Sequence, residues 1–92
     1  MALIQEFNYT NISTNTTANV FSGKGFLHSI VINTTAAGTI KIIDGVSGDT
    51  TANVGTLASS VLAGTFLYDV AISKGLIIIT AAASDVTVCW SQ

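Results

Sequence analysis

The feature that most constrains the fold is a two-residue alternation of apolar with polar or small side chains, which recurs along most of the chain. It is clearest over residues 64–73 and 85–91, where Val86, Val88 and Trp90 lie at every second position. A period of two places each set on one face of a β-sheet. Ile, Val, Thr and aromatic residues, which favour half-buried strands, dominate these runs, and glycines separate them. The sequence therefore predicts an all-β protein.

The spacing of the runs predicts eight short strands in one domain of 92 residues. We expect them at about residues 3–9, 17–22, 25–33, 38–44, 51–57, 64–73, 75–82 and 85–91. Eight antiparallel strands in this length indicate a β-sandwich over residues 1–92, with a jelly-roll-like strand order as the leading topology. Residues 8–19 are polar and low in complexity, so we interpret residues 1–19 as a possible N-terminal arm.

One hairpin follows from the two apolar runs that flank Ser73, Lys74 and Gly75. A three-residue loop with Gly75 in the left-handed conformation would join them, because Lys disfavours positive φ. The strands 64–73 and 75–82 would then pair in one sheet. In that register the apolar residues left on the face opposite the core are Leu67, Ala71, Ile77 and Ile79. We expect these four side chains to form an interface between copies of the chain.

Charge and composition exclude several classes of function. Charged residues make up 9% of the chain, against about 25% in ordinary soluble proteins, and the net charge is −2. Only three basic residues occur, Lys24, Lys41 and Lys74, which argues against nucleic-acid binding. No apolar run approaches the roughly 20 residues of a membrane helix, and we expect no membrane partner. The single cysteine, Cys89, cannot form an intrachain disulfide, and we interpret it as a small apolar filler.

The residues that could support catalysis or hold a metal are few and scattered. His28 is the only histidine and lies mid-strand on the face predicted for Phe26 and Ile30, so we interpret it as structural. Asp44 and Asp49 bracket the glycine-containing segment IDGVSGDT, where turn chemistry explains them better than a calcium site. We expect no catalytic residue, no metal, no cofactor and no enzyme activity.

Two kinds of surface could bind a partner. Tyr9, Tyr68 and Trp90 could form a platform for sugars, although Tyr68 and Trp90 fall on apolar strand faces and suit core packing better. The chain also contains no proline and little lysine, the residues that usually protect strand edges from pairing. This shortage, together with the surplus of aliphatic residues, predicts self-association into a homo-oligomer.

Two long blocks of the sequence resemble one family of small phage proteins. The blocks are GFLHSIVINTTAAGTIKIIDGVSGDT and GTFLYDVAISKGLIIITAAASDVTVCW, and they span about residues 25–90. The pattern is similar to that of head decoration or cement proteins encoded among tailed-phage structural genes. The matching residues are Gly25, Leu27, Ile30, Gly38, Thr39, Asp44, Gly64, Tyr68, Asp69, Gly75, Leu76, Asp85 and Val86. The resemblance implies a β-sandwich that trimerises on the outside of the capsid and carries no catalytic residues.

The expected function is therefore that of a virion structural protein, assembled in the host cytoplasm and bound to the outside of the major capsid protein shell. It would stabilise the head by burying surface area. Two alternatives stay open, namely another virion component such as a head fibre, collar or tail part, and a carbohydrate-binding module. The apolar side chains of the N-terminal arm, Leu3, Ile4 and Phe7, have two interpretations that stay open. Either they dock on a neighbouring subunit or on the capsid, or the segment is an ordinary edge strand of its own sheet.

Overall fold

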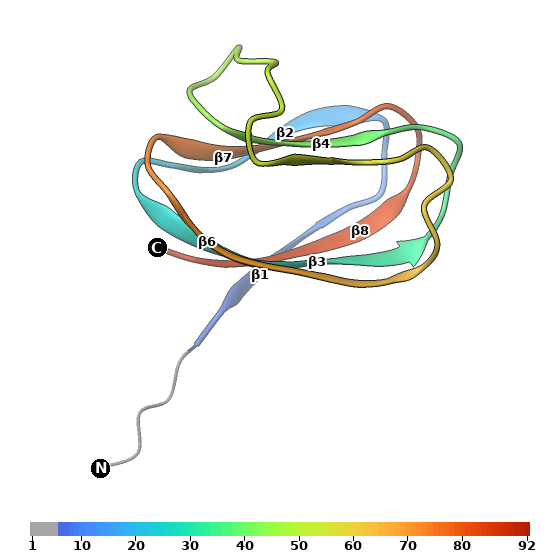
Figure 1. The fold of residues 1–92 in the computed structure, drawn as a ribbon, viewed down its shortest axis with the longest axis horizontal. Helices are drawn as coiled ribbons and strands as arrows, with labels where there is room; N and C mark the ends of the chain where they lie inside the picture. Colours follow the sequence, from blue (N-terminus) through green and yellow to red (C-terminus); the bar gives the residue numbers. More distant parts are fainter. Residues whose placement is uncertain (1–5) are drawn as a thin grey trace.

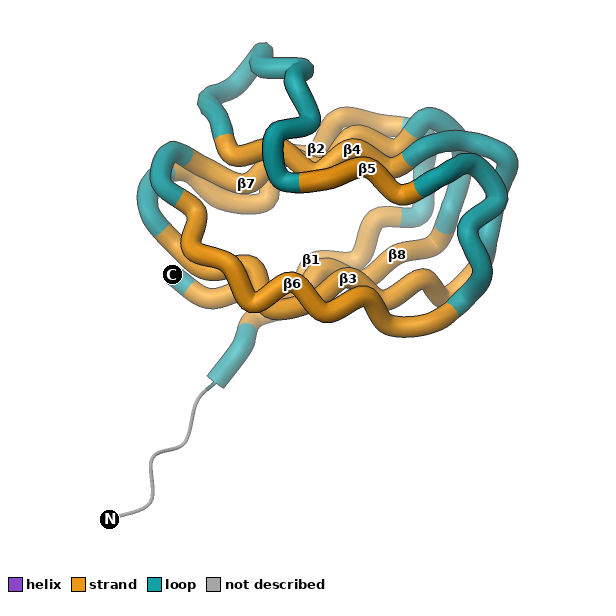
Figure 2. The backbone as a smooth tube through the Cα atoms, viewed as in Figure 1, coloured by secondary structure: helices purple, strands orange, loops and turns teal. Residues whose placement is uncertain are grey.

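The computed structural model describes residues 6–92 as two packed β-sheets (Figures 1 and 2). The strands in chain order are β1 (Asn8–Ile12), β2 (Thr16–Ser22), β3 (Gly25–Thr34), β4 (Ile40–Asp44), β5 (Gly55–Leu57), β6 (Gly64–Ile72), β7 (Gly75–Thr80) and β8 (Asp85–Ser91). The first sheet has the order β1-β8-β3-β6 and the second has the order β2-β7-β4-β5, with all pairs antiparallel. The all-β sandwich and its jelly-roll order are thus confirmed.

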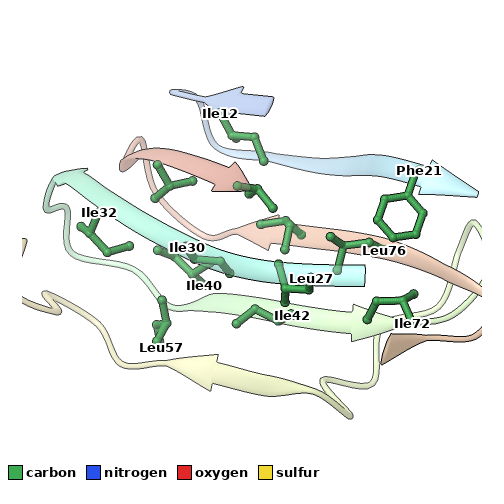
Figure 3. Packing of buried hydrophobic residues seen from close by; sticks show 13 residues of the cluster. Ile12, Phe21, Leu27, Ile30, Ile32, Ile40, Ile42, Leu57, Ile72 and Leu76 are labelled. Atoms are coloured by element: carbon green, nitrogen blue, oxygen red, sulfur yellow. The ribbon is translucent and has the colours of Figure 1, made fainter. Parts of the chain in front are cut away.

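The core lies between the two sheets and is almost entirely aliphatic (Figure 3). Its side chains come from alternate positions on strands of both layers, as the two-residue period predicts. The buried hydrophobic residues of this cluster are Ile12, Phe21, Leu27, Ile30, Ile32, Ile40, Ile42, Leu57, Ile72, Leu76, Ile78, Val86 and Val88. Burial of each large aliphatic side chain stabilises the fold by about 1.5–3 kcal/mol.

The predicted hairpin between β6 and β7 is wrong. Strand β6 pairs with β3 in the first sheet, whereas β7 lies between β2 and β4 in the second sheet. The connection at Ser73 and Lys74 therefore crosses from one layer to the other instead of reversing within a layer. Jelly-roll topology explains the difference, because most of its consecutive strands lie in opposite sheets. Only β4 and β5 are consecutive neighbours within one sheet of the described chain.

The polar segment 8–19, interpreted from the sequence as part of an N-terminal arm, forms strands instead. Residues 8–12 form β1, which pairs with β8 of the same chain, and β2 begins at Thr16. The segment forms strands because Thr is a good strand former and because its polar side chains face water at a sheet edge. Asn11 and Thr10 also bond to β8, through Asp85 and the indole of Trp90. Residues 8–19 therefore belong to the sandwich and not to an arm.

Candidate binding surface

The outer face of the first sheet carries the most distinctive surface chemistry of the described chain. Strand alternation sends one set of residues into the core and the other set outward. The outward residues include Tyr9 and Asn11 on β1, Thr87 and Cys89 on β8, Val31 and Asn33 on β3, and Leu67, Asp69 and Ala71 on β6. Cys89, interpreted from the sequence as a small apolar filler, is a free, half-buried thiol on this outer face and is not part of the core between the sheets.

Strand β6 forms one edge of this sheet and is its most open element. It is nine residues long, pairs on one side with β3, and stands at the end of the strand order. The other sheet edges, β1, β2 and β5, have five, seven and three residues. On β6 the side chain of Leu67 is 65% exposed, and Ala71 is also exposed. Unpaired strand edges of this kind are sites for strand addition.

A His–Asp pair lies where the pairing of β3 becomes irregular. The register of β3 shifts between Leu27 and Ser29 against both β6 and β8. His28 lies in this irregularity, and its Nδ1 is 2.5 Å from Oδ1 of Asp69 on β6. Asp69 has φ of 50°, in the left-handed region. A left-handed backbone at a residue other than glycine costs conformational free energy. Such residues, and irregularities in strand pairing, are often found near functional sites.

The same irregularity corrects the predicted environment of His28. We expected His28 to share a face with Phe26 and Ile30, but Ile30 lies in the core and His28 is half-buried on the outside. An extra residue in the strand reverses the alternation beyond it. The ring of Phe7 stacks on His28, with centroids 4.2 Å apart and planes inclined by 12°, and on Phe26 at 6.4 Å.

A polar network occupies the other half of the face and joins three strands. The Nδ2 amide of Asn11 on β1 donates to Oδ1 of Asp85 at 2.7 Å and contacts Oγ1 of Thr87 at 3.4 Å. The Nδ2 amide of Asn33 on β3 donates to the same two residues, at 3.3 and 3.0 Å. Because β8 lies between β1 and β3, the two asparagines flank Asp85 and Thr87 from opposite sides.

The three aromatic residues considered for sugar binding lie in different environments. Tyr9 is 75% exposed and points outward beside Asn11. Trp90 packs on the core, with its ring 5.2 Å from that of Phe21, and its indole N–H donates to Thr10. Tyr68 is also packed against the core, and burial raises the pKa of its hydroxyl. Of the three, Tyr9 is the one that a ligand could reach.

The structure does not bring the four predicted interface residues together. Leu67 and Ala71 lie outward on the first sheet, but Ile77 and Ile79 lie outward on the second sheet, at the opposite side of the sandwich. Ile77 is moreover 2% exposed and lies opposite buried Ile43 in the strand register, so it offers no surface to a partner. Ile79 is half-buried.

The predicted docking arm is partly outside the described residues. Leu3 and Ile4 fall outside residues 6–92, so the structure gives no position for them. Phe7 packs on His28 and Phe26 of its own chain. With β1 also paired to β8 of the same chain, docking of Phe7 on a neighbour is not what the structure shows.

The two aspartates of the IDGVSGDT segment hold turns. The carboxylate of Asp44 accepts backbone N–H groups from Ser73, Lys74 and Gly75 at 3.0, 2.8 and 3.4 Å. Partial burial would raise the pKa of Asp44, but these three hydrogen bonds and the charge of Lys74 outweigh it and lower that pKa. Asp49 accepts the N–H of Val46 at 2.9 Å. Asp49 thus shows the predicted turn chemistry within its own segment, whereas Asp44 stabilises the connection between β6 and β7.

Other candidate sites within residues 6–92 are weaker. A small open hollow lies beside Asp44, lined also by Asn53, Val54, Val70 and Ala71. No three His, Cys, Asp or Glu side chains of residues 6–92 gather closely enough to hold a metal ion. The same part of the chain contains no helix that is long and apolar enough to span a bilayer.

Sequence reasoning alone missed the His28–Asp69 pair and the network around Asp85. Their residues stand 41 and up to 76 positions apart, and only the strand order makes them neighbours. The sequence could show only that each of these residues falls on the outward-facing positions of its own strand. Comparison with known proteins found no matching family model, curated protein or solved structure.

Proposed function

We propose that this chain is a structural protein of a tailed-phage virion, which coats the outside of the head by binding the major capsid protein shell as a homotrimer. Its role is mechanical: contacts that span neighbouring shell subunits resist outward pressure from the packaged DNA. The sequence resemblance over residues 25–90 motivates this proposal. The jelly-roll order is compatible with it, because such sandwiches recur in viral capsid proteins, although they also serve as lectins.

The observation that carries the proposal is the open edge at β6. Leu67 presents a large aliphatic side chain to water at 65% exposure, next to nine residues of backbone that pair on one side only. Neither lysine nor proline occurs on this strand. Pairing or packing at this edge would bury Leu67 and Ala71 and satisfy the free backbone groups. The proposal assigns no catalytic step and no cofactor to the chain.

The self-association part is tested by placing the same charge at two exposed leucines. Leu67 lies on the β6 edge, whereas Leu62 lies on the loop before it and is 83% exposed. Native mass measurement should give a trimer for the wild type and for Leu62→Glu, and a monomer for Leu67→Glu. A monomeric wild type at micromolar concentration would contradict the proposed trimer. If Leu67→Glu is still a trimer, β6 does not form the interface.

A further inference from the structure

We propose that Tyr9 and the polar network of Asn11, Asn33, Asp85 and Thr87 form a binding site for a neutral sugar ring. This inference uses β1, β8 and β3, at the side of the first sheet away from the β6 edge, and goes beyond the structural role proposed above. It rests on three features of the site, namely the direction of its hydrogen-bonding groups, its exposed ring and its charge.

The first feature is that the network is rich in acceptors. Each asparagine commits its Nδ2 donor group to Asp85 and Thr87. Both bonds to Asp85 reach Oδ1, and within residues 6–92 no hydrogen bond uses its Oδ2. Among residues 6–92, no group donates to the carboxylate Oδ2 or to the two amide Oδ1 atoms, which are all acceptors. A ligand that matches such a surface must supply several O–H donors, as a sugar does.

The second feature is the aromatic ring beside the network. Tyr9 and Asn11 occupy successive outward positions on β1, which are about 7 Å apart along a strand. A pyranose ring has a comparable width, so one sugar can lie on the ring and reach the network at the same time. The exposed ring of Tyr9 offers an apolar face to the C–H groups of a sugar, and its two side-chain torsions cost little entropy to fix.

The third feature is charge, which selects neutral over acidic sugars. Asp85 and Asp69 are the acidic residues on the outer face of the first sheet, and none of the three lysines lies on it. Lys24 and Lys74 occupy turns, and Lys41 alternates with core residues of the second sheet. A sialic or uronic acid would place its carboxylate near Asp85 without a compensating cation.

The network also holds its side chains in place before any ligand binds. Asn11 is fixed by three acceptors, the third being the carbonyl of Val86 at 3.0 Å. Asn33 is fixed by two acceptors. Side chains that are already ordered lose less conformational entropy on binding. This lower cost helps the site to bind a ligand that makes only a few contacts.

The test is a titration of the isotope-labelled full chain with methyl glycosides of neutral hexoses, followed by amide NMR shifts. We expect millimolar binding with shifts centred on Tyr9, Asn11 and Asp85, and weaker binding of a methyl glucuronide. Tyr9→Ala should weaken binding about tenfold, whereas Tyr9→Phe, which keeps the ring, should not. Val46→Ala is the control, at a residue that is 59% exposed in the turn after β4 of the second sheet, and it should bind as the wild type does.

Asp85→Asn gives a second, independent readout because it keeps the size of the side chain and removes its charge. It should weaken neutral-sugar binding and abolish the discrimination against the glucuronide, with an unchanged melting temperature checking that the variant folds. The proposal is overturned if no neutral hexose shifts these amides at high millimolar concentration. Equal binding by Tyr9→Ala, or binding that a chelator of divalent ions abolishes, would overturn it too.

Discussion

His28 on β3 holds Asp69 on β6 through a contact of 2.5 Å between Nδ1 and Oδ1, at the point where the register between these strands shifts. The pair bridges the two strands where their regular pairing is interrupted. It also fixes the left-handed backbone of Asp69, because the side-chain bond compensates for part of the conformational cost. Phe7 stacks on the imidazole and so joins the chain before β1 to the same cluster.

The first prediction concerns this pair. Asp69→Ala should lower the free energy of unfolding by about 1–2 kcal/mol, because it removes the contact to His28 and leaves alanine at φ of 50°. Asp69→Asn should cost less than half of that, because asparagine tolerates the left-handed region and can still bond to the imidazole. Urea denaturation measures both variants. Equal losses of unfolding free energy in Asp69→Ala and Asp69→Asn would contradict the roles given to the left-handed backbone and to the bond with His28.

The second prediction concerns pH and Asp44. Its pKa lies below the ordinary value of 3.8, because three backbone N–H bonds and Lys74 outweigh the opposing effect of burial. A lowered pKa means that the carboxylate stabilises the fold fully above the unfolded value and that this contribution is lost as pH falls through the folded pKa. Asp44→Asn should therefore melt below the wild type at neutral pH.

That difference in melting temperature should narrow as the pH falls from about 3.8 through the lower folded pKa, because the wild-type carboxyl then becomes neutral too. Thermal melts of both proteins at a series of pH values provide the measurement. A gap that stays constant down to pH of about 2 would mean that the charge of Asp44 does not contribute.

The third prediction concerns the close approach of the backbone at Gly75. A Cβ at this position would lie 2.8 Å from the carbonyl oxygen of Gly45 and 3.0 Å from that of Phe21. Since both neighbours are backbone atoms, neither can move without displacing a strand, and Gly75→Ala should cost at least about 2 kcal/mol. Ser73→Ala in the same connection is the control, because Asp44 uses only its backbone N–H. Similar chemical denaturation midpoints for the two variants would refute the close approach.

The fourth prediction separates two aliphatic residues that the sequence alone placed on one surface. Ile77→Lys should unfold the subunit, because the side chain is 2% exposed and a buried unpaired charge is very unfavourable. Leu67→Lys should leave the subunit folded, because this side chain is 65% exposed. Circular dichroism at increasing temperature distinguishes them. A folded Ile77→Lys would place that residue on an accessible surface.

These contrasts show how far the sequence could determine the fold. The two-residue alternation indicated most of the strands, and the number of strands in this length indicated a jelly roll. The alternation also placed Ile77 correctly on the face opposite Leu76 and Ile78. It could not say which strand pairs with which. Two apolar runs joined by Ser73 and Lys74 look like a hairpin because the local pattern is the same whether the connection turns within a sheet or crosses between sheets.

The candidate surfaces were less predictable than the core for the same reason. The two-residue alternation indicates that Asn11 points outward. It does not indicate that Asn11 contacts Asp85, because that contact depends on the pairing of β1 with β8. The extra residue near His28 is also invisible to a period-two pattern, so Ile30 was assigned to the wrong face. Polar residues 8–12 were interpreted as part of an arm because their strand is a sheet edge with few buried side chains.

The most direct test of the central claim is a binding measurement on phage heads. The purified chain is mixed with emptied, expanded heads assembled from the major capsid protein encoded in the same genome, and bound copies are counted after sedimentation. The account predicts saturable binding at a fixed ratio to the shell protein, with three copies per site and a rise in the temperature at which the heads break. Heads that sediment without the chain, and break at an unchanged temperature, would contradict it.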